Sequence, residues 1–126
     1  MTTTDYGKYV IVVNGDWTYR YLAEAIAERE ALVPREMAAL INAEAKLAVL
    51  GPRLPYPHSS AVQGADRLRK LRPRGGRSPW RALYRQVGDE FVLAAVAPEA
   101  QVDPRGFVAG CRRAEARLAD FEETQG

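Results

Sequence analysis

The sequence predicts an α+β domain with the element order β-α-α-β-β-β-α. A helical hairpin and a C-terminal helix are expected to pack against a small, mainly antiparallel sheet. The prediction rests on two patterns: short runs rich in β-branched and aromatic residues, and longer runs whose apolar residues recur every three or four positions. The length of 126 residues fits one domain over 1–126, of which residues 1–8 are expected to be weakly ordered.

The first half of the chain contains one expected strand and two expected helices. Tyr9–Val13 (YVIVV) is a strand pattern that ends at the turn sequence Asn14-Gly15-Asp16. A helix is expected from about Trp17 to Leu32, and Asp16 is its expected N-cap. Pro34 suits the first turn of a second helix, which Gly51 then ends.

The second half is expected to supply most of the sheet. Residues 51–64 contain three prolines and read as a fixed, extended loop. The strands expected after it are about Arg67–Arg72, Trp80–Val87 and Glu90–Ala97. Gly88-Asp89 is a turn signal between the last two, which therefore form a hairpin. A flexible basic loop over residues 74–79 joins the first two.

A single amphipathic helix is expected to close the domain, from about Pro104 to Glu122. Asp103 is its expected cap, and the proline after it suits the first helical turn. Apolar side chains form one stripe along it, at Phe107, Cys111, Ala114, Leu118 and Phe121. This stripe is expected to face the sheet, with Cys111 in the core.

The composition is that of a soluble globular protein, with 47% hydrophobic and 27% charged residues. The single cysteine excludes an internal disulfide framework, and with one histidine the chain offers no zinc ligand set. Neither a secretion signal nor an apolar run long enough to cross a membrane is visible. We therefore expect a cytoplasmic protein with no membrane partner, no metal and no cofactor.

Positive charge is concentrated in one stretch, Arg67–Arg85 (RLRKLRPRGGRSPWRALYR), which holds eight basic residues and no acidic one. The overall net charge of +2 hides this, because residues 1–44, 45–88 and 89–126 have net charges of −3, +9 and −4. Crowded like charges raise the electrostatic free energy of the folded state. An anionic partner explains the cluster best, and phosphate groups are the commonest large anion.

Strand alternation sorts these charges onto faces. In the expected strand that begins at Trp80, Arg81, Leu83 and Arg85 share one face. If the opposite face packs on helices, Arg72, Arg81 and Arg85 point outward together and form a phosphate-binding surface. The alternative is that these arginines are a solvated sheet face, or pair with the acidic terminal helices.

Few other residues indicate a catalytic or binding role. Tyr56 lies between two prolines, which favours exposure and makes it a candidate for stacking on a base. His58 is the one imidazole of the chain, and the adjacent Ser59 and Ser60 do not make a catalytic triad with it. Gly75-Gly76 lacks the spacing of a nucleotide-binding loop.

Three short motifs in order resemble a known family. They are LGPRLPYPHS at residues 50–59, LRKLRP at residues 68–73 and RALYR at residues 81–85, followed by the amphipathic helix. Over residues 34–121 the chain resembles the RelE/ParE superfamily of bacterial toxins, and its HigB-like branch in particular. The resemblance implies the toxin of a type II toxin–antitoxin pair: a metal-independent endoribonuclease that cuts mRNA on the ribosome and is neutralised by a cognate antitoxin, a small helix-turn-helix protein.

The resemblance also implies roles for individual residues. The matching catalytic positions are Arg72 and Arg81, with Lys70 and Arg85 as supporting charges. Many members of this branch carry lysines after the last strand, whereas residues 96–103 contain none, so Glu99 or His58 is the expected acid or base. The remaining side chains expected to bind RNA are Arg67, Arg69, Arg74, Arg77, Tyr56 and His58.

Two other functions stay open at the level of the sequence. ParE-like members of the superfamily poison DNA gyrase, and the missing lysines fit a toxin of that kind. They also fit a module whose basic face only docks RNA or an acidic peptide. The cluster can in addition serve the antitoxin, because an acidic segment that neutralises it would occlude the site.

Overall fold

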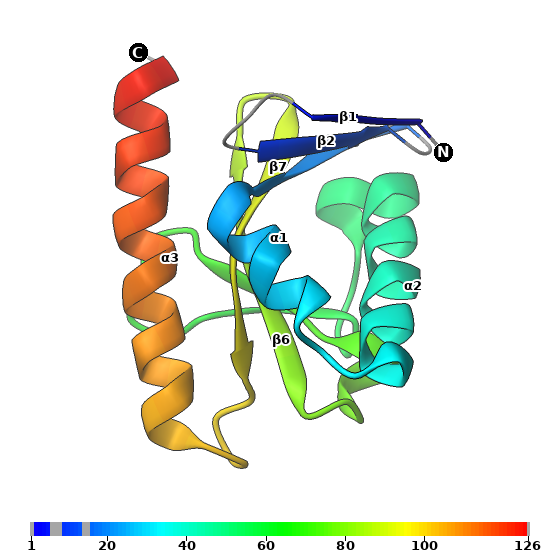
Figure 1. Ribbon diagram of the computed structural model, residues 1–126, viewed down its shortest axis with the longest axis vertical. Coiled ribbons are helices and arrows are strands. Elements are labelled where there is room, and N and C mark those ends of the chain that lie inside the picture. The colour runs from blue at the N-terminus through cyan, green and yellow to red at the C-terminus, as the bar shows by residue number, and fades with distance from the viewer. Residues whose placement is uncertain (1, 6–8, 14–15, 126) are drawn as a thin grey trace.

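The structure, a computed structural model, describes residues 2–5, 9–13 and 16–125. In this part of the chain seven strands form one sheet in the order β1-β2-β3-β7-β6-β5-β4, and all neighbours are antiparallel except β3 and β7. Helix α3 covers one face of the sheet and α2 the other, with α1 between them (Figure 1). The predicted α+β class and mainly antiparallel sheet are confirmed.

The strands are β1 (Thr2–Asp5), β2 (Tyr9–Val13), β3 (Thr18–Leu22), β4 (Ser59–Ala61), β5 (Arg69–Leu71), β6 (Trp80–Val87) and β7 (Glu90–Pro98). The α-helices are α1 (Ala23–Glu30), α2 (Pro34–Leu50) and α3 (Pro104–Gln125), and the 3₁₀ turns are η1 (Gly51–Arg53) and η2 (Pro73–Gly76).

The N-terminal region contains more strand than the sequence analysis expects. Thr18–Leu22 is strand β3, so the expected helix over 17–32 is wrong in its first third, and α1 begins only at Ala23. Alternating β-forming residues explain this, because Tyr19 and Tyr21 both point into the core beside α2. Asp16 therefore does not cap a helix. Residues 2–5, within the stretch expected to be weakly ordered, form β1, and the expected turn at residues 14–15 lies outside the described residues.

Two predicted helices have the expected starts. Helix α2 begins at Pro34 and stops where Gly51 adopts a φ of 55°, a backbone conformation that residues with a Cβ rarely adopt. Helix α3 begins after Asp103, whose carboxylate accepts a hydrogen bond of 2.9 Å from the backbone N–H of Gly106. The capping residue predicted for α3 is confirmed.

Each face of the sheet has its own core. On the α2 face the core centres on Leu40 and Leu47 of the helix and on Tyr84 and Leu93 of the sheet. On the α3 face it contains Leu83, Val92, Ala114, Leu118 and Phe121, with Phe107 and Cys111 partly buried against it. Because helices cover both faces, the charged residues of β6 have no solvated side of the sheet to occupy.

Along part of β7, side chains of α1 and α3 form the backbone hydrogen bonds that a neighbouring strand would otherwise form. Strand β3 pairs only with residues 90–93 of β7, and a register shift opposite Leu83 and Tyr84 follows. Beyond that point Glu28 of α1 accepts a 2.9 Å hydrogen bond from the Val96 N–H. Arg117 of α3 donates to the Ala94 carbonyl at 2.9 Å and pairs with Glu28. These bonds hold α1 and α3 on the open edge of β7.

Candidate nucleic-acid interface

In the folded protein, the basic side chains of the Arg67–Arg85 cluster, apart from Arg85, line three hollows. One is a cleft beside the start of α3, which we call the basic cleft and which is lined by Lys70, Arg72, Arg77 and Arg81. A second is a hollow beside α2 that shares two of these residues, and a third is a larger hollow near the far end of β6. Arg85 lines none of the three.

The basic cleft has a volume of about 380 Å³ and lies between β5, η2, β6 and the segment that joins β7 to α3. Glu99 is the one carboxylate among its described lining residues. The backbone N–H of Glu99 donates to the Pro79 carbonyl at 2.8 Å, which holds the β7–α3 segment against the start of β6. The cleft thus places one acid among four cations.

Arg81 forms the floor of the basic cleft and is only 3% exposed. Its guanidinium donates to three backbone carbonyls, those of Ser78 at 2.7 Å, Trp80 at 2.9 Å and Gly76 at 3.2 Å, and lies 3.8 Å from Glu99. Burial and the charge of Arg72 lower the pKa of Arg81, while Glu99 acts in the opposite direction. The expectation that Arg81 points outward is wrong, since its donors are used inside the protein.

Arg72 keeps donors available on the wall of the same cleft. One terminal nitrogen donates to the Pro57 carbonyl at 3.0 Å, and the guanidinium lies over the Tyr56 ring at 4.8 Å. Its Nε is buried without a hydrogen-bond partner. A Cβ at Gly76 would lie 2.7 Å from the other terminal nitrogen, so the glycine makes room for this side chain. Arg72 is the cation best placed to bind an incoming anion.

Lys70 and Arg77 complete the basic cleft. The Lys70 ammonium lies 5.4 Å from the centre of the Phe107 ring of α3, a cation–π contact that orients it toward the cleft. Arg77 is exposed and uses only its Nε, which donates to the Arg74 carbonyl at 3.1 Å. Both side chains retain N–H groups for a ligand.

Arg85 lies on the same face of β6 but under the middle of α3. It is 5% exposed, donates to the Asp66 carbonyl at 2.7 Å and forms ion pairs with Glu115 at 3.0 Å and Glu122 at 3.7 Å. Two glutamates of the acidic C-terminal segment therefore neutralise it. The expectation that Arg85 points outward beside Arg72 and Arg81 is wrong, and the alternative of pairing with a terminal helix holds at this residue.

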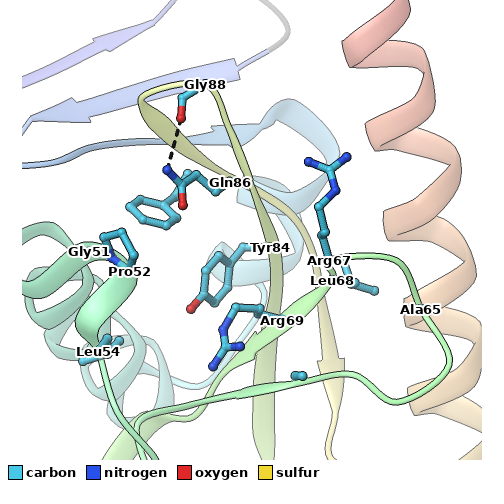
Figure 2. A pocket seen from close by; sticks show the side chains of 12 residues that line it. Gly51, Pro52, Leu54, Ala65, Arg67, Leu68, Arg69, Tyr84, Gln86 and Gly88 are labelled. Atoms are coloured by element: carbon cyan, nitrogen blue, oxygen red, sulfur yellow. Dashed lines mark hydrogen bonds between the residues drawn. The ribbon is translucent and has the colours of Figure 1, made fainter.

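The larger hollow, of about 560 Å³, contains two of the residues expected to bind RNA, Arg67 and Arg69. Figure 2 shows Arg69 beside Tyr84 within it, while Arg67 extends in another direction. The Nε of Arg69 donates to Ser59 at 3.0 Å, and Ser59 and the Tyr84 hydroxyl lie 2.6 Å apart. Most other lining residues are apolar or glycine, including Leu54, Leu68 and Phe91, so this hollow differs in chemistry from the basic cleft.

The hollow beside α2, which we call the α2 hollow, has a volume of about 400 Å³ and includes Arg72, Arg77, Arg74 and His58 from the predicted set. Arg74 is already paired with Glu36 at 2.8 Å. Helix α2 contributes three polar side chains that the sequence analysis missed, Arg35, Asn42 and Lys46. Their spacing along one exposed helix face is visible in the sequence and could have indicated a polar surface. It is a weaker signal than the run of positive charge further along the chain.

No protein-family model, curated protein or solved structure matches this chain. Over residues 2–5, 9–13 and 16–125, no helix has the length and apolar character needed to span a bilayer. In the same described residues, no three His, Cys, Asp or Glu side chains lie together as a metal-binding group.

Proposed function

We propose that this chain is a metal-independent endoribonuclease that cleaves mRNA, and that it acts as the toxin of a toxin–antitoxin pair. The basic cleft supports this most directly, because Lys70, Arg72, Arg77 and Arg81 line it together with the carboxylate of Glu99. Guanidinium and ammonium groups bind phosphate, and one carboxylate among them supplies a proton acceptor. The order of the three motifs between residues 50 and 85, which resembles the HigB-like toxins, supports the biological role.

The proposed reaction needs a base, an acid and a source of positive charge. The 2′-oxygen of the ribose attacks phosphorus while the bond to the 5′-oxygen breaks, which leaves a 2′,3′-cyclic phosphate and a 5′-hydroxyl. Glu99 takes the proton of the 2′-hydroxyl, and Lys70, with its three donors, returns a proton to the departing 5′-oxygen. Arg72 and Arg77 stabilise the negative charge on the phosphorane.

Arg81 has a different part in this proposal. Its hydrogen bonds to the carbonyls of Gly76 and Ser78 hold the η2 loop over the start of β6. Its charge still raises the electrostatic potential of the basic cleft, since an arginine stays protonated at neutral pH. Arg81 is thus a positioning residue, and Arg85 stabilises the packing of α3.

The partners and the location belong to the same proposal. A cytoplasmic enzyme would meet mRNA on the ribosome, and an acidic segment of an antitoxin would block the basic cleft by charge complementarity. Acidic side chains are the natural complement, because the cleft contains four cations and one acid among its described residues.

Controlled expression in a bacterial host tests the proposal. We expect growth arrest on induction and new transcript ends, mapped by primer extension, that depend on translation of the message. RNA cut in this way ends in a 2′,3′-cyclic phosphate, a diester that resists phosphatase until mild acid opens the ring, so a gel-mobility shift that requires acid before phosphatase detects it. Unchanged growth together with intact transcripts would reject the nuclease, and growth arrest with inhibited gyrase supercoiling would indicate the gyrase-directed alternative.

One observation favours a second function, RNA binding without cleavage. The Arg81 donors are used by backbone carbonyls, so only part of the predicted catalytic set faces a substrate. In that case the purified protein would bind RNA with a strong dependence on salt and leave the strand intact on and off the ribosome.

A further inference from the structure

We propose that the α2 hollow is a second RNA-binding site, in which helix α2 holds the phosphate backbone of the strand whose scissile phosphate occupies the basic cleft. This inference rests on the proposed function. It assigns a role to Arg35, Asn42 and Lys46, which lie on a helix remote in sequence from the Arg67–Arg85 cluster. The two sites adjoin, because Arg72 and Arg77 line both.

The surface of α2 suits an extended chain. Arg35, Asn42 and Lys46 follow one another at steps of seven and four, so they lie along a single face of the helix. The residues between them in the hollow are Ala38, Ala39 and Ala43, whose short side chains leave a shallow floor. From Arg35 to Lys46 the helix rises about 16 Å, which exceeds the reach of one phosphate group.

The charges of this surface are unbalanced. Arg35 and Lys46 are exposed and form no hydrogen bond or ion pair with the described residues. Glu36 is the acidic neighbour of Arg35 on α2, and its carboxylate is occupied by Arg74 at 2.8 Å and by the Ser78 hydroxyl at 2.8 Å. No carboxylate lines the described part of the α2 hollow, so it attracts an anion along its whole length.

A nucleic-acid strand fits these features better than a small anion or an acidic peptide does. The cations are spread along the helix, so a single phosphate would reach only some of them. Tyr56 is 73% exposed and lies against Arg72 at the junction of the two sites, where its free face suits stacking of a base. The aspartate and glutamate side chains of an acidic peptide have no ring to stack on that aromatic face. We therefore assign the α2 hollow to single-stranded RNA.

The test compares two double variants of the full chain by fluorescence anisotropy. Arg35→Ala/Lys46→Ala removes the two unpaired cations of the α2 hollow, and Arg53→Ala/Arg112→Ala removes two exposed cations that line none of the three sites. The probes are a labelled single-stranded RNA of about a dozen nucleotides, long enough for both sites, and a labelled trinucleotide.

For Arg35→Ala/Lys46→Ala, the α2 variant, we expect the affinity for the longer RNA to fall about tenfold. The trinucleotide should bind to it as it does to the wild-type protein. The slope of log affinity against log salt concentration falls by about 1.4, because each lost phosphate contact on a single strand contributes about 0.7. The matched control variant should reproduce the wild-type affinity for both probes. Equal thermal unfolding midpoints confirm that all three proteins are folded.

An α2 variant that binds the longer RNA like the wild-type protein would overturn the inference, whatever its nuclease activity. An effect on a poly-glutamate peptide but none on RNA would overturn it in favour of an acidic protein partner. If wild-type protein never cleaves RNA and the expected loss of affinity is still found, the proposed nuclease fails while the second RNA-binding site stands.

Discussion

The two ends of strand β6 use the same residue type on the same face in opposite ways. Arg81 and Arg85 are 3% and 5% exposed. Arg85 meets two glutamates of α3, whereas Arg81 meets one, Glu99, at 3.8 Å. Arg81 also shares a cleft with Lys70, Arg72 and Arg77, so positive charge remains in surplus there.

This contrast distinguishes an arginine that stabilises the fold from arginines that belong to a binding site. Burial does not distinguish the two ends, because both guanidiniums are covered and hydrogen-bonded to backbone carbonyls. The balance of charge around each guanidinium distinguishes the two ends. A buried arginine with its own carboxylates stabilises packing, while uncompensated cations in a cleft are retained against their mutual repulsion and therefore suggest a missing anion.

Substitution of Glu99 should have the largest effect at the Arg81 end. Glu99→Gln keeps the size of the side chain and removes its ability to take a proton, so we expect RNA cleavage to slow by about 10²–10⁴-fold. Binding of an uncleavable 2′-deoxy analogue should be unchanged or tighter, because a negative charge leaves the basic cleft. Single-turnover cleavage and anisotropy measure the two quantities.

A Glu99→Gln variant that cleaves at the wild-type rate would reduce Glu99 to an ion-pair partner of Arg81. His58 in the α2 hollow is then the remaining acid or base of the predicted set, and His58→Gln becomes the decisive variant.

Substitution of Arg72 should have the second largest effect on RNA cleavage. Arg72→Ala removes a guanidinium that lines the basic cleft and makes a single internal hydrogen bond, and loss of one such transition-state contact typically costs about 10²–10³-fold in rate. Stability should change little, since the side chain makes one hydrogen bond, to the Pro57 carbonyl. Growth arrest on induction and the urea midpoint are the measurements.

Arg69→Ala is the matched control for Arg72→Ala, because Arg69 belongs to the same cluster but lines the larger hollow. It should remain toxic. If Arg69→Ala abolished toxicity and Arg72→Ala did not, the site would have to be moved to the other side of the sheet.

At the opposite end of β6, Arg85→Ala should act on stability alone. The variant loses a buried hydrogen bond to the Asp66 carbonyl and the ion pair with Glu115, and we expect unfolding in urea to become easier by about 2–3 kcal/mol. Arg85→Met keeps most of the buried stem and should cost about half as much. RNA cleavage per folded molecule should match the wild-type protein, and a specific loss of cleavage would mean that Arg85 belongs to the site after all.

Local sequence signals predicted much of the fold. The bounds of α2 follow from Pro34 and Gly51, the start of α3 from Asp103, and the β6–β7 hairpin from Gly88-Asp89. Each of these signals is a backbone preference or a side-chain cap that acts within a few residues. Strand β3 was missed because Leu22 and Ile26 fit a helical spacing that competes with the alternation of Tyr19 and Tyr21.

The site was predicted less well, for a tertiary reason. Alternation correctly placed Arg81 and Arg85 on one face of β6, but sequence does not tell whether the last helix packs on the same face of the sheet as the helical hairpin. Helix α3 covers the opposite face and pairs with Arg85, while the loop around η2 and Glu99 enclose Arg81. The one glutamate near Arg81 and the two near Arg85 come from segments distant in sequence, so the contrast between the two ends emerges only in three dimensions.

The smallest expected effect concerns Arg67, the first member of the cluster. Its φ of 55° is strained for a residue with a Cβ, and its side chain is 62% exposed beside Asp66. Arg67→Gly relieves this strain but increases the freedom of the unfolded chain, so we expect a net gain of about 0.5 kcal/mol in urea unfolding. RNA affinity should change less than about twofold, because a residue outside the basic cleft and the α2 hollow contributes only screened, long-range charge. A large loss of RNA affinity in Arg67→Gly would extend the RNA-binding surface to the larger hollow. The comparison of Arg81 with Arg85 would then no longer separate the RNA-binding part of the cluster from the rest.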